Sequence, residues 1–295
     1  MNDMIKAFSE AASFLTQKFR PLAEMLSDEE KKNARELRLR AGAGFSVFVN
    51  GAEKLLSGSV TPTDLSDVLE LATERSLHCA RSSVAQGFVT VRGGHRVGLC
   101  GSAVKNSDGV SGIRELSSVS IRIAKEIKGV ADGIYDTVMR NGVFRNTLVV
   151  APPGCGKTTL LRDLVRNVSD RGVRVSLVDE RGEIAAKYRG VPQLNVGKCT
   201  DVLDGIDKAR GSMMLLRSMT PDIIAMDEIS DEADCKAVRS ISGCGTGVLA
   251  TAHGKNLTEL LRHDTYRELF DKKAFECVIT LEKDGNGFLK KIEAV

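Results

Sequence analysis

The feature that most constrains this chain is residues 148–164, which read LVVAPPGCGKTTLLRDL. A short apolar run meets a turn rich in proline and glycine, and the chain continues through Lys157 and two threonines into a helical pattern. A strand, a glycine-rich turn and a helix N-terminus together form a cradle of backbone N–H groups that suits a phosphate. The stretch therefore predicts a strand–loop–helix unit that binds a nucleotide.

Each position of this loop has a chemical reason. Gly154 and Gly156 let the backbone approach a phosphate where a Cβ would collide. Lys157 supplies a point charge to the β- and γ-phosphates, and Thr158 supplies a hydroxyl to Mg²⁺. The nucleotide-contacting residues that we predict in the loop are Pro153, Gly154, Cys155, Gly156, Lys157, Thr158 and Thr159.

The loop departs from the pattern G-x-x-x-x-G-K-[ST] at its first position, where Ala151 stands in place of glycine. That position must be small, and alanine is acceptable there provided that its φ is negative. The alternative interpretation is a helix that merely begins after a glycine turn. The strand on one side and the helix on the other favour the phosphate loop.

The stretch PDIIAMDEIS supplies the second half of a nucleotide-hydrolysing site. Residues 223–226 predict a buried strand, and Asp227 and Glu228 follow at its C-terminal end, where parallel sheets place their ligands. We expect Asp227 to hold Mg²⁺ through water and Glu228 to polarise the attacking water.

Two further strand ends carry candidate residues. In SLVDERGEIA, Glu180 competes with Glu228 for the role of general base, and the sequence leaves both open; a salt bridge of Glu180 with Arg181 or Arg171 is the structural alternative. In GVLATAHGKNLTELL, Thr251 and His253 end an apolar strand, where a polar side chain can touch a γ-phosphate.

The second half of the chain alternates apolar strands with helical segments, which predicts a parallel sheet with helices on both faces. The first half reads as mixed α and β, so we predict an N-terminal α/β domain over 1–130 and an ATPase domain over 131–295. The strands predicted after residue 130 are 146–150, 173–178, 222–226 and 247–252, the helices are 157–168 and 204–218, and a hairpin over 284–287 closes the chain. Before residue 130 we predict helices over 4–26, ending near Pro21, and over 61–80, strands within ELRLRAGAGFSVFV and SVSIRIA, and a hairpin within GFVTVRGGHRVGLCG.

Composition excludes several classes of protein. The 295 residues carry a net charge of +3, and residues 81–122 hold six basic residues against two acidic ones. That stretch is either a solvated face or a surface that meets phosphates or an acidic partner. The chain lacks Trp, which predicts an aliphatic core, and its seven cysteines form no CxxC pair, so we expect reduced thiols in a cytosolic protein. No apolar run is long enough to span a membrane.

The order of these motifs resembles the secretion ATPases of type II and type IV systems, which carry a phosphate loop, an acidic box, a DE strand end and a histidine box. Over about residues 30–295 the chain also resembles the stage III sporulation protein AA family of endospore-forming bacteria. The segments that carry this resemblance are ELRLR, GFVTVRGGHRVGLCG, SVSIRIAKEIKG, APPGCGKTTLLRD, DERGEIA, RSMTPDIIAMDEI and ATAHG.

The resemblance implies a RecA-like P-loop ATPase that uses ATP and Mg²⁺, assembles as a homo-oligomer with a hexamer as the expected form, and resides in the mother-cell cytoplasm. It implies membrane-embedded sporulation channel proteins as partners, with peripheral docking and no membrane insertion. In secretion ATPases, arginines from the N-terminal domain or a neighbouring subunit reach the phosphates. Arg114 and Arg122 match that region best, and Arg96 and Arg217 are further candidates.

Three functions remain open at this point. The first is a ring-shaped mechanoenzyme that energises channel assembly or transport. The second is a nucleotide-gated scaffold with little turnover, although the presence of both Asp227 and Glu228 argues against it. The third is a RecA-type nucleic-acid motor, since fold does not fix function; three Tyr, no Trp and little net charge offer no stacking platform, and we expect no nucleic acid as a partner.

Overall fold

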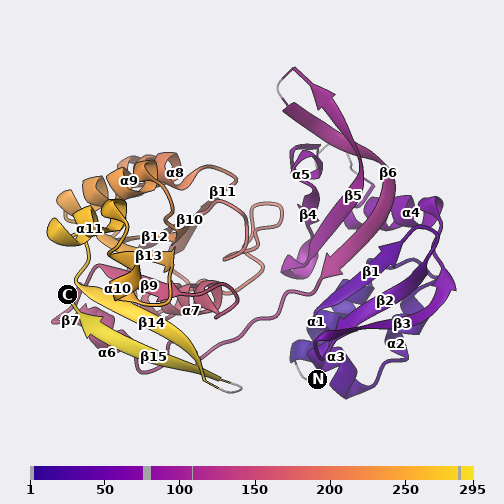
Figure 1. The fold of residues 1–295 in the computed structure, drawn as a ribbon, viewed down its shortest axis with the longest axis horizontal. Helices are drawn as coiled ribbons and strands as arrows, with labels where there is room; N and C mark the ends of the chain where they lie inside the picture. Colours follow the sequence, from indigo (N-terminus) through magenta and orange to yellow (C-terminus); the bar gives the residue numbers. More distant parts are fainter. Residues whose placement is uncertain (1–2, 76–80, 108, 285–286) are drawn as a thin grey trace. The chain divides into compact units, whose positions relative to one another are not determined.

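The computed structural model describes residues 3–75, 81–107, 109–284 and 287–295. The chain forms two compact units, each built around one large sheet (Figure 1). The first unit comprises Met1–Glu126 and Ala186–Gln193, and the second comprises Ile127–Ala185 and Leu194–Val295. The domain boundary at 130 stays a prediction, and no sequence signal indicates that 186–193 belongs with the first unit.

The first unit contains a six-stranded sheet in the order β3-β2-β1-β6-β5-β4, with every neighbouring pair antiparallel. The predicted pair of strands within ELRLRAGAGFSVFV and the hairpin around 93–94 are confirmed. β5 and β6 run much further than the sequence predicts, because their outer halves are polar and exposed and lack an apolar alternation. The strand bounds are β1 Glu36–Arg40, β2 Gly44–Val49, β3 Ala52–Ser59, β4 Phe88–Thr90, β5 Arg96–Asn106 and β6 Gly109–Arg122.

The helices of the first unit begin at recognisable caps. Thr61 caps α4 and forms a reciprocal capping box with Asp64, as the sequence predicts. The prediction of one helix over 4–26 is wrong, because α1 ends at Ala12 and Pro21 lies in the first turn of α2, a position where proline is tolerated. The segment 76–80 of the predicted helix over 61–80 lies outside the described residues. The helix bounds are α1 Asp3–Ala12, α2 Arg20–Glu24, α3 Asp28–Asn33, α4 Pro62–Ala72, α5 Arg81–Ala85 and the 3₁₀ turn η1 Arg92–Gly94.

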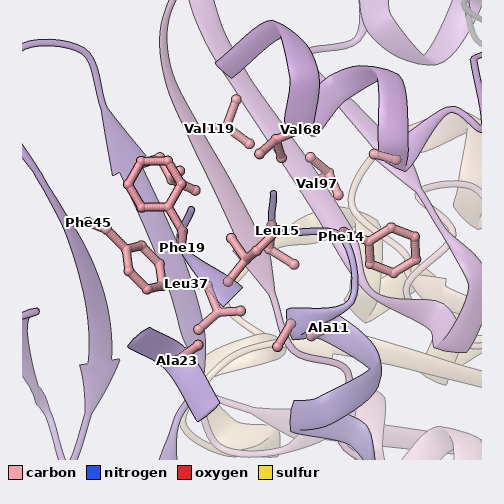
Figure 2. Packing of buried hydrophobic residues seen from close by; sticks show 14 of the residues in the cluster. Ala11, Phe14, Leu15, Phe19, Ala23, Leu37, Phe45, Val68, Val97 and Val119 are labelled. Carbon is pink, nitrogen blue, oxygen red and sulfur yellow. The ribbon is translucent and has the colours of Figure 1, made fainter. Parts of the chain in front are cut away.

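The core of the first unit contains aromatic rings, contrary to the aliphatic core that we predicted. Phe19 and Phe45 lie with their ring centroids 5.6 Å apart, and both are fully buried beside Leu37 (Figure 2). Ten Phe residues in the chain are enough to supply such a cluster even though Trp is absent. A low aromatic content of the whole chain therefore does not predict the composition of the core of an individual unit.

Residues 186–193 form a tight turn within the first unit. Tyr188 and Val191 exchange two backbone hydrogen bonds of 2.9 Å, and both residues between them have positive φ. The Tyr188 hydroxyl donates to Glu74 Oε1 at 2.7 Å, and Gly93 N–H donates to Gln193 Oε1 at 2.9 Å. These side-chain contacts hold the turn in the first unit.

The second unit contains a seven-stranded sheet in the order β11-β10-β12-β13-β9-β14-β15. Six strands are parallel and β15 is antiparallel to β14, which confirms the predicted parallel sheet and C-terminal hairpin; residues 285–286 of that hairpin lie outside the described residues. The strand bounds are β9 Thr147–Ala151, β10 Val175–Asp179, β11 Thr200–Asp204, β12 Ile223–Glu228, β13 Gly247–His253, β14 Cys277–Asp284 and β15 Gly287–Ala294. A small separate hairpin pairs β7 Met139–Arg140 with β8 Val143–Phe144.

Helices cover both faces of this sheet (Figure 1). Val149 packs in one apolar cluster with residues of α7, whereas its neighbours Leu148 and Val150 pack in the opposite cluster with residues of α9. The predicted helix over 204–218 begins only at Lys208, because Asp204 ends the outermost strand β11 and Asp207 is the N-cap, whose side chain accepts the N–H of Arg210. The helix bounds are α6 Tyr135–Val138, α7 Lys157–Ser169, α8 Lys208–Ser218, α9 Glu232–Gly243, α10 Leu257–Leu260 and α11 Asp264–Asp271.

Candidate nucleotide site

The strand order of the second unit brings four predicted site residues to one edge of the sheet. β13 lies between β9 and β12, and all three strands are parallel. Lys157 follows β9, His253 ends β13, and Asp227 and Glu228 end β12. Residues that are far apart in sequence therefore meet at the carboxyl ends of adjacent strands.

The loop between β9 and α7 has the backbone that the sequence predicts for a phosphate cradle. Gly154 and Gly156 have φ of +74° and +81°, a region that favours glycine. Gly156 is the N-cap of α7 and provides no side-chain cap, so the first N–H groups of a 13-residue helix are available to an anion. Ala151 lies in the extended backbone of β9, opposite His253, which explains why its methyl group is tolerated.

The ammonium group of Lys157 is already engaged by neighbours within the site. Its Nζ donates to the backbone oxygen of Ala151 at 3.0 Å and lies 2.6 Å from His253 Nδ1 and 3.8 Å from Glu228 Oε2. The side chain is buried, and burial lowers the pKa of Lys157, with Glu228 and Asp227 acting in the opposite direction. A buried ammonium group needs anionic partners in place of water. Phosphate oxygens would supply them, so they fit this position.

His253 joins the lysine to the carboxylate. Because a lysine ammonium only donates, Nδ1 of His253 accepts from Lys157, and the ring proton then lies on Nε2. Nε2 is 2.9 Å from Glu228 Oε2 and donates to it. The imidazole therefore bridges the phosphate loop and the end of β12 in a defined tautomer.

Asp227 has the environment of a cation ligand. Burial raises the pKa of its carboxyl group, and the negative charges of Glu183, Asp179 and Glu228 raise it further. Thr251 Oγ1 lies 3.4 Å from Asp227 Oδ1. A divalent cation would relieve this concentration of negative charge, and Thr158 in the first turn of α7 offers the hydroxyl that the phosphate-loop pattern assigns to Mg²⁺.

Mg²⁺ does not require a complete protein cage at such a site. Within the described ranges, no group of three or more His, Cys, Asp or Glu side chains is arranged to hold a metal ion. Mg²⁺ commonly takes one or two protein ligands and completes its shell with water and phosphate oxygens. The donor set of Asp227 and Thr158 fits that mode of binding.

The acidic box after β10 is held by its own backbone. The buried Asp179 carboxylate accepts N–H groups from Glu183, Ile184 and Ala185, and Arg162 of α7 donates to the carbonyl groups of Glu183 and Ile184. These contacts fold the loop back, so that Glu183 contributes to the field at Asp227. The sequence marks Glu183 as part of an acidic strand end but assigns it no role; its position four residues after Asp179 was the available signal.

The structure places Glu180 apart from the Lys157–His253–Glu228 contacts. Its Oε2 accepts from Lys208 Nζ at 2.5 Å, a partner that the sequence does not predict for this carboxylate. Arg171 instead stacks over the Tyr135 ring, with its guanidinium carbon 4.1 Å from the ring centroid.

Comparison with known proteins identifies the family. A family model described as "Sporulation stage III, protein AA" matches residues 9–292. The chain belongs to this family. Stage III sporulation protein AA of Bacillus subtilis (strain 168) is 34% identical to it over 291 residues, which cover 96% of this chain and 94% of that protein. Protein SEEDLING PLASTID DEVELOPMENT 1 of Arabidopsis thaliana is 28% identical over 180 residues, or 59% of this chain and 24% of that protein.

Solved structures share the fold of this stage III sporulation protein AA family member. The Legionella pneumophila ATPase DotB aligns with a TM-score of 0.59 at 15% identity, covering 88% of this chain and 77% of DotB. The pilus retraction motor PilT with bound ADP aligns with a TM-score of 0.59 at 18% identity, covering 89% of this chain and 79% of PilT. The predicted RecA-like P-loop fold is therefore confirmed.

The candidate arginines lie outside the contacts described for the phosphate loop. Arg114 and Arg122 are on β6 in the first unit, and Arg96 lies on β5 with its guanidinium carbon 4.1 Å from the centroid of the Phe88 ring. Arg217 is in the last turn of α8 in the second unit. Their approach to a nucleotide stays a prediction. Among the helices of the described residues, none is both long and apolar enough to cross a membrane.

Proposed function

We propose that the protein is an ATP-hydrolysing mechanoenzyme that energises assembly of, or transport through, a channel between mother cell and forespore. The observation that carries the proposal is the contact of Lys157, His253 and Glu228 at the mouth of a helix N-terminus without a side-chain cap. The family and its Bacillus subtilis relative support the sporulation context, and the fold shared with DotB and PilT supports the ATPase chemistry.

The chemistry assigns a role to each residue of the site. Backbone N–H groups of residues 154–158 bind the phosphates, and Lys157 exchanges its contact with His253 for the β- and γ-phosphates. Thr158 and Asp227 hold Mg²⁺, which when bound neutralises phosphate charge and polarises the phosphoryl oxygens. Glu228 accepts a proton from the water that attacks the γ-phosphorus, and the products are ADP and phosphate.

His253 connects binding to hydrolysis in this proposal. While Lys157 occupies Nδ1, the Nε2 proton of His253 is donated to the Glu228 carboxylate. When Lys157 moves to the phosphates, Nδ1 loses its donor and the imidazole is free to turn toward the γ-phosphate. The carboxylate then loses one hydrogen-bond donor and becomes a stronger proton acceptor at the moment a substrate is present.

The assembly belongs to the same proposal. A homo-oligomer, which we propose to be a hexamer, would let Arg114 or Arg122 of one subunit stabilise the phosphate charge in the next, and this would couple hydrolysis to subunit motion. We propose cytoplasmic residence in the mother cell, with docking onto membrane-embedded sporulation channel proteins. We expect no nucleic acid as a partner.

The testing experiment measures phosphate release with ATP and Mg²⁺ across a range of protein concentrations, with native mass measured in parallel. Wild type, Lys157→Ala and the matched control Lys272→Ala are compared; Lys272, the C-cap of α11, forms an exposed ion pair with Glu268. We expect turnover that rises with oligomer formation, a loss of about 100-fold or more in Lys157→Ala, and no loss in the control.

Two outcomes would replace the proposal. Nucleotide binding without turnover at any concentration would favour the nucleotide-gated scaffold. Salt-sensitive DNA binding that stimulates hydrolysis would favour the nucleic-acid motor.

A further inference from the structure

Lys208 occupies a position that is unfavourable for a cation. It is the first residue of α8, where the positive end of the helix dipole repels an ammonium group. Its side chain is only 13% exposed, so little water compensates for the charge. A lysine in this position needs anionic partners, and the identity of those partners indicates the role of Lys208.

Two carboxylates supply the compensation. Lys208 Nζ lies 2.5 Å from Glu180 Oε2 and 3.6 Å from Asp234 Oδ2. Burial acts to lower the pKa of Lys208, but Glu180, Asp234 and Asp227 outweigh it and raise the pKa. The ammonium group therefore stays charged at the same carboxyl edge of the sheet that holds the candidate cation ligand.

The two partners belong to different parts of the site. Glu180 begins the acidic box after β10, whereas Asp234 lies in the first turn of α9, just beyond β12. The Asp234 carboxylate accepts the N–H of Ser230 at 3.0 Å, and this fixes the turn that follows Glu228. The Tyr266 hydroxyl donates to the Ile229 carbonyl in the same turn at 2.6 Å. Lys208 thus connects the acidic box to the turn that follows Glu228.

The two candidate bases are held by different cations. Glu180 is paired at hydrogen-bond distance with an ammonium that Asp234 also holds. Glu228 lies 3.8 Å from Lys157, the ammonium that bound phosphates would draw away, and it accepts from the neutral imidazole of His253. Glu228 therefore lies against residues of the phosphate loop and of β13, whereas Glu180 is held away from them by its ion pair with Lys208.

We propose that Lys208 is a positioning residue of the ATPase site. Lys208 holds Glu180 in a structural ion pair, and Glu228 is therefore the general base. This inference rests on the proposed function, and it resolves the choice between Glu180 and Glu228 that the sequence leaves open.

The first test is a comparison of steady-state ATP hydrolysis by Lys208→Met and Lys208→Arg. Methionine leaves Glu180 and Asp234 without their cation and releases the turn after Glu228, so we expect kcat to fall by about 10- to 100-fold, as for a misplaced catalytic group. KM for ATP should change by less than about threefold, because loss of a group that does not bind substrate leaves uniform binding intact. Arginine keeps the charge and should restore most of kcat, which a role in packing alone would not predict.

The second test compares Glu180→Gln with Glu228→Gln. Glutamine at 180 still offers an oxygen to Lys208, so we expect kcat to fall by no more than about tenfold, whereas loss of the general base at 228 should cost roughly 100-fold to 10,000-fold. In Lys208→Met the additional change Glu180→Gln removes an unpaired carboxylate, and the double variant should recover part of the lost kcat.

The control is Lys236→Met, which removes an exposed ion pair with Glu232 on α9 and should leave both kcat and KM unchanged. The inference is overturned if Glu180→Gln loses as much activity as Glu228→Gln, or if Lys208→Met keeps the wild-type kcat. Absence of turnover in the wild type is a separate result, because it refutes the proposed function itself and the inference with it.

Discussion

The Nζ atom of Lys157 lies 2.6 Å from Nδ1 of His253, and this contact joins the start of α7 to the end of the neighbouring strand β13. Glu228 at the end of β12 completes the chain of contacts through Nε2 of the same imidazole. A phosphate that draws Lys157 away therefore changes the surroundings of the carboxylate two strands along. His253 makes this link, and its removal would leave Lys157 and Glu228 without a shared hydrogen-bond partner.

Replacement of His253 by glutamine should lower turnover more than it lowers nucleotide binding. The variant keeps a polar side chain at the end of β13 but loses the imidazole that links Lys157 to Glu228. We expect kcat to fall by about 100-fold, as for catalytic groups left out of position, with nucleotide Kd within about threefold. Steady-state hydrolysis and calorimetric binding measure the two effects. His263→Gln, on the N-cap of α11, is the matched control, and an equal loss there would refute the role of His253.

Replacement of Gly154 by alanine should weaken nucleotide binding beyond its effect on stability. Gly154 has φ of +74° and a Cβ there would project into open space within the loop, where we propose that phosphates bind. Gly172 has φ of +92° and is equally open, but it lies in the turn after α7. Both alanine variants should lose about 1–2 kcal/mol of unfolding free energy from backbone strain, whereas only Gly154→Ala should lose about tenfold or more in affinity for ADP. Equal affinities in the two variants would argue against phosphate binding at this loop.

The first unit should lose stability as the pH falls from about 6.5 to about 4, because His95 is buried in its neutral form. Its Nδ1 accepts the N–H of Ala124 at 3.0 Å, and burial lowers the pKa of His95 to about 4 from 6.5. The unfolded chain binds this proton at a higher pH than the folded chain, so the stabilisation is complete above pH 6.5 and is lost as the pH falls through 4. The shift corresponds to on the order of 3 kcal/mol.

Amide hydrogen exchange of residues 118–124 between pH 7 and pH 4, corrected for the intrinsic pH dependence, measures this loss. His95→Gln should flatten the dependence in that window, and a wild-type slope in the variant would refute the assignment. The carboxylates of Glu30 and Glu53 act at lower pH, because ion pairs and hydrogen bonds with Lys54 and Arg40 lower the pKa of each to about 2.

A valine at Gly94 should displace the turn at 186–193 from the first unit. Gly94 has φ of +77°, and a Cβ there would lie 3.1 Å from the Ala186 Cβ and 3.3 Å from the Gln193 Cβ. We expect tryptic cleavage after Arg189 to accelerate by about tenfold, as for a local opening made about 1.4 kcal/mol easier. Gly42→Val carries similar backbone strain with open space around the Cβ, and it should leave this cleavage unchanged. Equal acceleration in the two variants would mean that backbone strain, and not displacement of the turn at 186–193, exposes the cleavage site after Arg189.

Strands buried on both faces were predictable, and exposed ones were not. The runs that became β9, β10, β12 and β13 read as continuous apolar segments, as parallel strands covered by helices do. β11 has the sequence TDVLD and lies at the edge of the sheet, and no strand is predicted there because its polar residues interrupt any apolar run. The outer halves of β5 and β6 pair mainly with each other and are exposed, and no hydrophobic pattern marks such strands.

The sequence by itself determined the glycine-rich loop before α7, the strand ends that carry Asp227, Glu228 and His253, and the family. These features are local, since glycine spacing, apolar runs and the residue that follows each run depend on a few neighbours along the chain. Only the tertiary structure decided which of those residues meet. The order of strands places His253 between Lys157 and Glu228, and the packing of α8 brings Lys208 to Glu180. Such pairings join segments tens of residues apart, and their energy comes from burying both faces of one sheet, which no short stretch of sequence encodes.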